Sequence, residues 1–309
     1  IIALSTGDQP MFSPETSIVI VFNGDIYNYI ELREELKSLG HSFITTSDTE
    51  VIIHAYMQWG VDCQNKLNGC WGFAIWDDNK KQLFISRDRL GEKPMHYAIW
   101  NNSFVFGSEI KSLFSFGVPG DMDDSLLEIY FFLKFIPSPY TFFKQIKKLK
   151  PGHFLLINGS EIKERKYWDL PEIDEKNMLS DTKETNNNFE FLLKDSVNIR
   201  MRSDVPFGAL LSGGLDSASV VALMSEISKF PVETFTIGYD DASFDETDLA
   251  KDAANKFNTN HHSYKVEAES FEDSLRKILF HYDEPFGDAS AIPTGIVSRY
   301  ARKFVKMVL

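Results

Sequence analysis

One six-residue segment, Ser212-Gly213-Gly214-Leu215-Asp216-Ser217, restricts the fold of this chain more than any other. It follows the apolar run Ala209-Leu210-Leu211, typical of a buried strand, and precedes a stretch whose apolar residues share one helical face. Backbone N–H groups at a helix N-terminus attract anions, and two residues without Cβ let the backbone wrap closely around phosphate oxygens. The segment therefore predicts a phosphate-binding loop between a strand and a helix.

Asp216 indicates that a cation also binds at this loop, because a carboxylate repels a bare phosphate. Its presence is explained if it holds a Mg²⁺ ion that bridges phosphate oxygens. The chain has no GxxxxGK[ST] segment, which disfavours cleavage between the β and γ phosphates. A Gly-containing turn with incidental serines is disfavoured, because strand, loop and helix signals agree here.

Composition narrows the class of protein and its partners. The chain has 309 residues, enough for two domains, and a net charge of -13, which opposes binding to nucleic acid or to an anionic membrane surface. Its two cysteines, Cys63 and Cys70, fit neither a disulfide framework nor a zinc site, so we expect a reducing cytoplasm. A first residue, Ile1, that is not Met and an apolar end up to Leu309 indicate a fragment.

The periodicity of apolar residues changes along the chain, which predicts two domains. In the first half we expect a strand over 17–22, a turn at Asn23-Gly24-Asp25, and two helices, the second with a capping box of Ser47 and Glu50. Short strands over 72–76, 82–87, 95–100 and 103–108 then predict antiparallel sheets. After a polar connection over 158–188, strands and helices alternate from 205 to 266, which predicts a parallel α/β sheet.

The loop at 212–217 resembles the SGGxDS loop of the ATP pyrophosphatases. This resemblance implies a domain of the adenine nucleotide alpha hydrolase type, in which ATP and Mg²⁺ adenylate an oxygen nucleophile and release pyrophosphate. It also places adenine and ribose beside Leu210, Leu211, Ile237 and Gly238. The adjacent His261 and His262 match the family in position, but neighbouring strand residues point to opposite faces, which favours structural hydrogen bonds over catalysis.

The first half carries four segments that together resemble the class II glutamine amidotransferases. They are Val21-Phe22-Asn23-Gly24-Asp25-Ile26-Tyr27-Asn28, Ser47-Asp48-Thr49-Glu50, Arg87-Asp88-Arg89-Leu90-Gly91-Glu92-Lys93-Pro94 and Gly107-Ser108-Glu109-Ile110-Lys111. The resemblance implies an α+β domain of the N-terminal nucleophile hydrolase type, two antiparallel sheets covered by helices. Its nucleophile is an N-terminal cysteine, which this chain lacks, and the resemblance gives that role to neither Cys63 nor Cys70.

The same resemblance implies roles for six residues of the first half. Asn23 and Gly24 match the pair that forms the oxyanion hole, and the alternative is an ordinary hairpin turn. Asp48 matches the carboxylate that receives the amino group of the substrate, and the alternative is an acidic residue at a helix start. Ile1 and Ile2 match a glutamine-binding strand. Asp25 also matches a glutamine-binding position, but the commonest family members have Glu there, which shortens its reach.

Together the halves resemble a glutamine-hydrolysing asparagine synthetase. We expect an amidotransferase domain over 1–157, a linker over 158–188 and a synthetase domain over 189–309, with glutamine, aspartate and ATP as small-molecule partners and a homodimer as a candidate assembly. The fragment itself is expected to be inactive. The segment from Asp283 to Pro293 resembles a version found in many bacterial members of the family, some of which amidate uronic acid sugars. Another carboxylate acceptor therefore stays open, with Asp288 either near it or simply at a helix start. A β-lactam synthetase-like enzyme and an inactive regulatory homologue also stay open.

Overall fold

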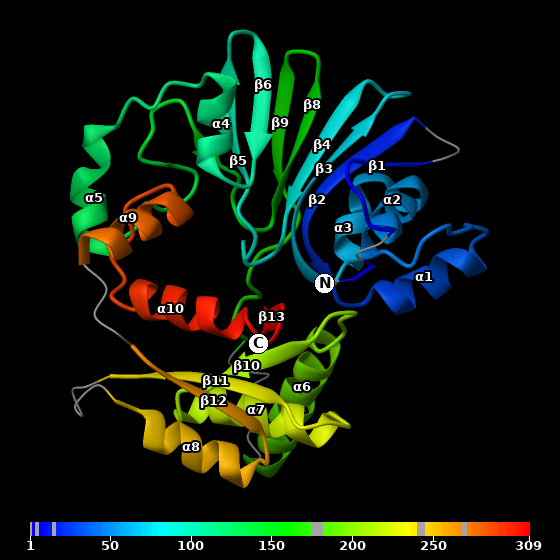
Figure 1. The fold of residues 1–309 in the computed structure, drawn as a ribbon. Coiled ribbons are helices and arrows are strands. Elements are labelled where there is room, and N and C mark those ends of the chain that lie inside the picture. Colours follow the sequence, from blue (N-terminus) through cyan, green and yellow to red (C-terminus); the bar gives the residue numbers. More distant parts are fainter. Residues whose placement is uncertain (1, 4–5, 14–16, 175–181, 240–244, 267–270) are drawn as a thin grey trace. The chain divides into compact units, whose positions relative to one another are not determined.

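The structure of the chain is a computed structural model that describes residues 2–3, 6–13, 17–174, 182–239, 245–266 and 271–309 (Figure 1). The chain forms two compact units. One contains residues 2–171 together with 279–287, and the other contains residues 172–278 and 288–309. We call them the amidotransferase unit and the nucleotide unit after the two resemblances.

The amidotransferase unit holds two antiparallel sheets, as the spacing of the short strands predicts. The larger has the order β1-β2-β3-β4-β8-β9 and the smaller the order β6-β5-β7. Its strands are β1 (Met11–Phe12), β2 (Ile18–Ile26), β3 (Gly69–Asp77), β4 (Gln82–Arg87), β5 (His96–Trp100), β6 (Ser103–Gly107), β7 (Lys147–Lys148), β8 (His153–Asn158) and β9 (Glu161–Lys166).

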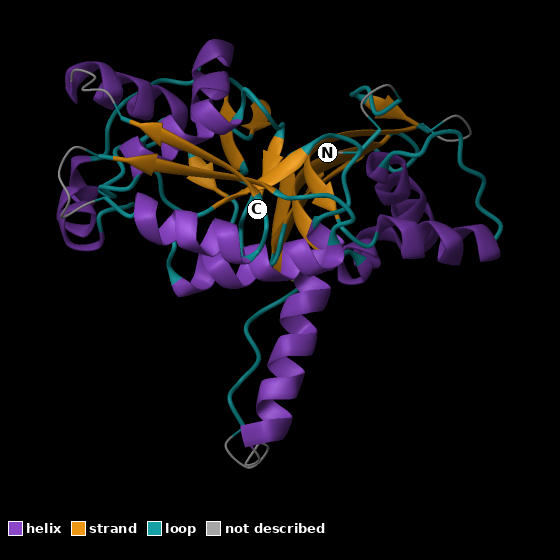
Figure 2. Cartoon of the chain, turned by 60° about the horizontal axis from the view of Figure 1, so that its bottom comes forward, coloured by secondary structure: helices purple, strands orange, loops and turns teal. Residues whose placement is uncertain are grey.

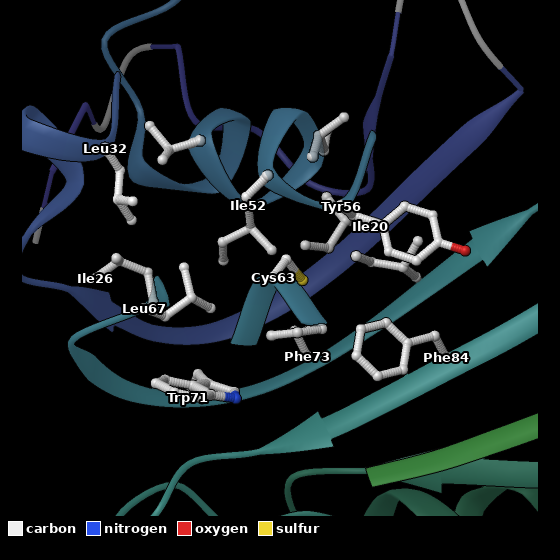
Figure 3. Close-up of a cluster of buried hydrophobic side chains, with 14 of the residues drawn as sticks. Ile20, Ile26, Leu32, Ile52, Tyr56, Cys63, Leu67, Trp71, Phe73 and Phe84 are labelled. Atoms are coloured by element: carbon white, nitrogen blue, oxygen red, sulfur yellow. The ribbon is translucent and has the colours of Figure 1, made fainter. Parts of the chain in front are cut away.

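Three helices cover one face of the larger sheet because their apolar residues pack against its inward-facing side chains. These helices are α1 (Tyr29–Ser38), α2 (Asp48–Trp59) and α3 (Cys63–Lys66), with the short η1 (Gly60–Asp62) between the last two. Figure 3 shows the resulting core, in which Ile52 and Tyr56 of α2 meet Trp71, Phe73 and Phe84 of the sheet. The opposite face packs against aromatic residues of the smaller sheet, which completes the predicted sandwich.

Two local predictions for this unit are wrong in detail. Asn23, Gly24 and Asp25 form no turn, because β2 continues through them and pairs them with residues 70–72 of β3. Glu50 does not close a capping box, since its carboxylate accepts hydrogen bonds from the N–H groups of residues 44 and 45. Ser47 nevertheless caps α2 as expected, accepting from the N–H of residue 49 at 3.1 Å.

The remaining helices of this unit are α4 (Ile110–Phe116), η2 (Asp124–Leu126) and α5 (Leu127–Leu133). Helix α9 (Phe271–Tyr282) ends inside the segment 279–287 that joins this unit. The amidotransferase unit is thus built mainly from residues up to 171, with one short contribution from much later in the sequence.

The nucleotide unit has a parallel sheet of order β12-β11-β10-β13, which confirms the predicted α/β class (Figure 1). Figure 2 draws all strands in orange and all helices in purple. Its strands are β10 (Phe207–Leu210), β11 (Glu233–Gly238), β12 (Asn260–Lys265) and β13 (Met307–Val308), and its helices are α6 (Thr182–Arg200), α7 (Leu215–Ile227), α8 (Thr247–Lys256) and α10 (Ala291–Ala301). Ala209 packs with α6, α7 and α8 on one face, whereas Leu210 packs with α10 on the other. Burial on both faces explains the continuous apolar run around β10.

Candidate functional site

A pocket of about 400 Å³ lies in the nucleotide unit at the carboxyl end of β10 and β11. In open parallel sheets this edge is where ligands bind, because loops and helix N-termini converge there. Five predicted nucleotide residues line it together, namely Leu210, Leu211, Ser212, Ser217 and Ile237. The predicted Gly213, Gly214, Leu215, Asp216 and Gly238 adjoin these residues in sequence but are not part of the lining.

The loop after β10 has the geometry that its sequence predicts. Gly213 adopts φ +80°, and a Cβ at this position would lie 2.6 Å from Leu249 Cβ, so both the conformation and the close packing require glycine. Ser212 Oγ accepts a hydrogen bond from the N–H of Gly214 and lies 3.0 Å from Ser217 Oγ. Helix α7 begins directly after Gly214, so its N-terminal turn faces the loop.

Asp216 lies in the first turn of α7 with its side chain exposed. Magnesium ions in nucleotide sites are commonly held by one or two carboxylates plus phosphate oxygens and water, so a single accessible Asp in the helix turn that follows the loop fits such an ion. Within the described ranges, no group of three or more His, Cys, Asp or Glu side chains is arranged to hold a metal by protein ligands alone.

The two adjacent histidines make separate contacts, as the strand geometry predicts. His261 Nδ1 lies 3.0 Å from Thr234 Oγ1, and His262 Nε2 lies 2.6 Å from Glu233 Oε2. His262 also stacks on the ring of Phe235 in the core. These contacts give both side chains a structural role in the sheet.

Helix α10 contributes a wall of the nucleotide pocket that sequence reasoning missed. Ser290, Pro293, Thr294 and Val297 line it, although nothing in their spacing separates them from an ordinary amphipathic helix. Nearby Asp288 is not in the lining, and its carboxylate accepts a hydrogen bond from the Ser290 N–H at 2.8 Å. This bond is typical of an acid that starts a helix.

A second pocket, of about 590 Å³, lies in the amidotransferase unit. Segments far apart in the sequence form it: β2, the loop after residue 93, the end of β6 and the start of α4. Its lining consists of Gln9, Val21, Phe22, Asn23, Gly72, Pro94, Met95, Phe106, Gly107, Ser108, Glu109 and Ser112. Asn23 is the predicted catalytic residue that this pocket contains.

The side chain of Asn23 is held in a defined direction, because its Nδ2 donates to Ser108 Oγ at 3.1 Å. The amide nitrogen carries two hydrogens and Ser108 uses one of them. Gly24 follows in β2, where an added Cβ would overlap the carbonyl oxygen of Cys70 on β3. A side chain at this position is therefore excluded by the neighbouring strand, whatever the role of the backbone N–H.

Four further residues of the predicted glutamine site lie elsewhere or outside the described ranges. Asp48 is buried and accepts a hydrogen bond from the Ile26 N–H at 3.0 Å; burial raises its pKa to about 6 despite this bond. Asp48, Asp25 and Ile2 are not in the pocket lining. Ile1 is outside the described residues. Their contacts with substrate remain predictions.

The Arg87-Asp88 motif organises the loop that forms another pocket wall. The Asp88 carboxylate accepts from the N–H groups of residues 71, 90, 92 and 93, and the Arg87 guanidinium donates to the carbonyls of residues 91, 93 and 149. Asp88 is almost completely buried, so these bonds satisfy a carboxylate that would otherwise be costly to bury. The motif thus fixes Pro94 and Met95 at the pocket.

His96 and Ser108 form a contact that no local signal in the sequence predicts. His96 Nδ1 donates to the carbonyl oxygen of Ser108 at 3.0 Å, and burial together with nearby Lys148 lowers the pKa of His96 to about 4. The neutral ring therefore holds the Ser108 backbone while the Ser108 hydroxyl contacts Asn23.

Neither cysteine has the surroundings of a nucleophile. Burial raises the pKa of Cys63, which lies in the core under α2, and burial also raises the pKa of Cys70, whose sulfur lies 3.3 Å from Tyr27 Oη. A reactive thiol needs a lowered pKa, so both act as packing residues. In the part of the chain that the structure describes, no helix is long and apolar enough to cross a membrane.

Comparisons with known proteins assign a family to each part of the chain. Residues 1–168 match a family model described as a glutamine amidotransferase domain, and residues 188–309 match one described as asparagine synthase. A Methanocaldococcus jannaschii protein named, provisionally, asparagine synthetase [glutamine-hydrolyzing] 2 is 42% identical over 94% of this chain and 56% of its own length. Asparagine synthetase [glutamine-hydrolyzing] 1 of Bacillus subtilis is 35% identical over 100% of this chain and 48% of its own length.

The chain thus spans about half the length of the curated relatives it matches. A solved glutamine phosphoribosylpyrophosphate amidotransferase from B. subtilis covers 87% of this chain and 52% of its own with a TM-score of 0.39 and 15% identity, a likeness too low to bear on the site. The sequence matches confirm the resemblance given by the motifs. The chain belongs to the glutamine amidotransferase family over its first half and continues into an asparagine synthase domain, the pairing found in the glutamine-hydrolysing asparagine synthetases.

Proposed function

We propose that the intact protein makes asparagine from aspartate, with glutamine as nitrogen donor and ATP as energy source. The observation that supports this most directly is the presence of two pockets, one in each unit. One contains Asn23 and the other begins at the Ser212 loop. Two units with two chemistries are what a synthetase that hydrolyses glutamine requires.

In the amidotransferase pocket, the expected reaction is hydrolysis of the glutamine side-chain amide. Attack on the amide carbon places negative charge on its oxygen, and preorganised donors lower the barrier by stabilising that charge. The second hydrogen of Asn23 Nδ2 and the N–H of Gly24 are our candidates for these donors. The attacking thiol is assigned to an N-terminal cysteine by the family resemblance, since Cys63 and Cys70 are buried and protonated.

In the nucleotide pocket, a carboxylate oxygen of aspartate would attack the α phosphorus of ATP and displace pyrophosphate. Ammonia would then attack the acyl carbon of β-aspartyl-AMP, and AMP would leave as asparagine forms. The backbone around Gly213 and Gly214 and the hydroxyls of Ser212 and Ser217 would bind the pyrophosphate portion. A Mg²⁺ ion held by Asp216 would offset the charge on the leaving group when bound.

A homodimer and a cytoplasmic location belong to the same proposal. Both cysteines are unpaired and buried, which fits a reducing compartment. Sedimentation of the intact protein tests the dimer, since a single species of monomer mass at micromolar concentration would contradict it.

One experiment tests the proposed function and its rivals together. Intact protein is given glutamine, ATP, Mg²⁺ and a panel of carboxylates that includes aspartate and a uronic acid sugar, and products are identified by mass. Asparagine, AMP and pyrophosphate in equal amounts are expected. Amidation of a sugar instead would identify a sugar amidotransferase. Ring closure without use of glutamine would identify a β-lactam synthetase-like enzyme, and ATP binding without release of pyrophosphate would identify a regulatory homologue.

A further inference from the structure

Two acidic residues from the asparagine synthase part of the sequence are built into the amidotransferase unit. Asp283 and Glu284 lie in the segment 279–287, which packs with residues 2–171 although the family match places it in the synthetase half. Asp283 follows α9 directly and adopts a left-handed backbone conformation with φ +63°, which turns the chain sharply at this point. Both carboxylates are nearly buried.

Asp283 acts on the start of α4. Its Oδ2 accepts a hydrogen bond from the Ile110 N–H at 2.7 Å, and its Oδ1 lies 3.0 Å from Lys111 Nζ. Glu109, the residue at the N-cap position, makes no side-chain capping bond of its own and instead pairs with Lys111 at 3.1 Å. The first N–H of α4 is thus satisfied by a residue 173 positions away in the sequence.

Glu284 acts on the strand that neighbours this wall. Its Oε1 accepts from the Phe142 N–H and its Oε2 lies 2.6 Å from Lys148 Nζ. Lys148 belongs to β7 and pairs in register with His96 of β5, whose ring holds the Ser108 carbonyl. Charge-assisted bonds of this length in a nearly buried setting resist displacement.

These contacts converge on Ser108 and Glu109, which line the amidotransferase pocket together with Asn23. Ser108 is held through its carbonyl by His96 and through its hydroxyl by Asn23, while the two residues that follow Glu109 are held by Asp283. The wall is therefore fixed from both of its ends, and one of the fixing groups comes from the synthetase half.

We propose that Asp283 and Glu284 are positioning residues that hold the Ser108-Glu109 wall of the glutamine pocket, so that amide hydrolysis depends on a segment of the synthetase sequence. The proposal rests on the proposed glutaminase function of that pocket. Asp283 holds Ile110 and Lys111, whereas Ser108, which orients the Asn23 amide, is also held by His96. Losing the Asp283 contacts therefore loosens the wall at Glu109 first and acts on substrate binding more than on the chemical step.

The test measures glutamate release from glutamine by the full-length protein, without ATP or aspartate. Asp283→Ala removes both contacts and should raise KM for glutamine by roughly tenfold while kcat changes less than about threefold. Asp283→Asn tolerates the left-handed conformation and still offers an oxygen to the Ile110 N–H, so it should restore most of the loss. Glu284→Gln should raise KM by an intermediate factor. Glu272→Gln, which breaks an exposed ion pair with Arg276, is the matched control and should leave KM unchanged.

The possible results separate the two proposals. Wild-type protein that releases no glutamate would contradict the proposed function itself. Active wild-type protein with the same KM in Asp283→Ala would overturn the positioning role. If Asp283→Ala does not fold, Glu284→Gln decides. A wild-type KM in that folded variant overturns the role, and a raised KM supports it.

Discussion

Asp48 should destabilise the protein at neutral pH, and Asp48→Asn should therefore stabilise it. Burial raises the pKa of this carboxyl from 3.8 to about 6, against the hydrogen bond from the Ile26 N–H. The folded state thus holds the Asp48 proton more tightly than the unfolded state does. Stability should fall as the pH rises from about 4 to about 6 and stay low above that range.

The size of the effect follows from the difference between the two pKa values. About 2 pKa units at about 1.36 kcal/mol each give an upper value near 3 kcal/mol. Asp48 is also the first residue of α2, and a negative charge at a helix N-terminus is favoured by roughly 0.3–1 kcal/mol. We therefore expect Asp48→Asn to gain about 2 kcal/mol at pH 7, because Asn retains an oxygen for the Ile26 N–H.

Tryptophan fluorescence during urea unfolding is the appropriate assay. All 5 Trp residues of the chain lie within the first 168 residues, so the signal reports on the amidotransferase unit alone. The difference between variant and wild type should grow between pH 4 and pH 6 and then stay constant. Equal midpoints at pH 7 and parallel pH profiles would refute the reasoning. Weaker glutamine binding by the stabilised variant would add support for the predicted role of Asp48.

Three further outcomes are expected. Gly213→Ala should lower ATP affinity at least about tenfold, since the left-handed φ alone costs roughly 1–2 kcal/mol; Gly295→Ala, whose Cβ meets open space, is the control in the same titration. Gly24→Ala should lose about 2–3 kcal/mol of stability through overlap with Cys70, seen as an earlier urea midpoint, and an unchanged midpoint would argue against the β2–β3 pairing. Wild-type protein should lose up to about 3 kcal/mol of stability as the pH falls from about 6.5 to about 4, because the buried His96 ring stays neutral while the unfolded ring takes up a proton. His96→Gln should not show this loss. A variant as acid-sensitive as wild type would contradict the reasoning.

Local signals in the sequence determined the elements that carry the chemistry. The apolar run before Ser212, the two glycines and the helical face after Ser217 predicted a strand, a loop and a helix N-terminus, and the structure has all three. These signals succeeded because each depends on residues a few positions apart that interact within the same element. The change from short strands to alternating strands and helices likewise predicted the two fold classes.

Only the tertiary structure decided which groups meet. Asn23 and Gly24 have the composition of a turn, yet pairing with β3 keeps them in a strand. Glu50 accepts hydrogen bonds from the N–H groups of residues 44 and 45 in the preceding loop rather than from its own helix. Asp283 has no local feature that assigns it to the start of α4. Buried polar groups must find partners wherever packing places them, and a sequence read in short windows holds no record of partners that lie many residues away.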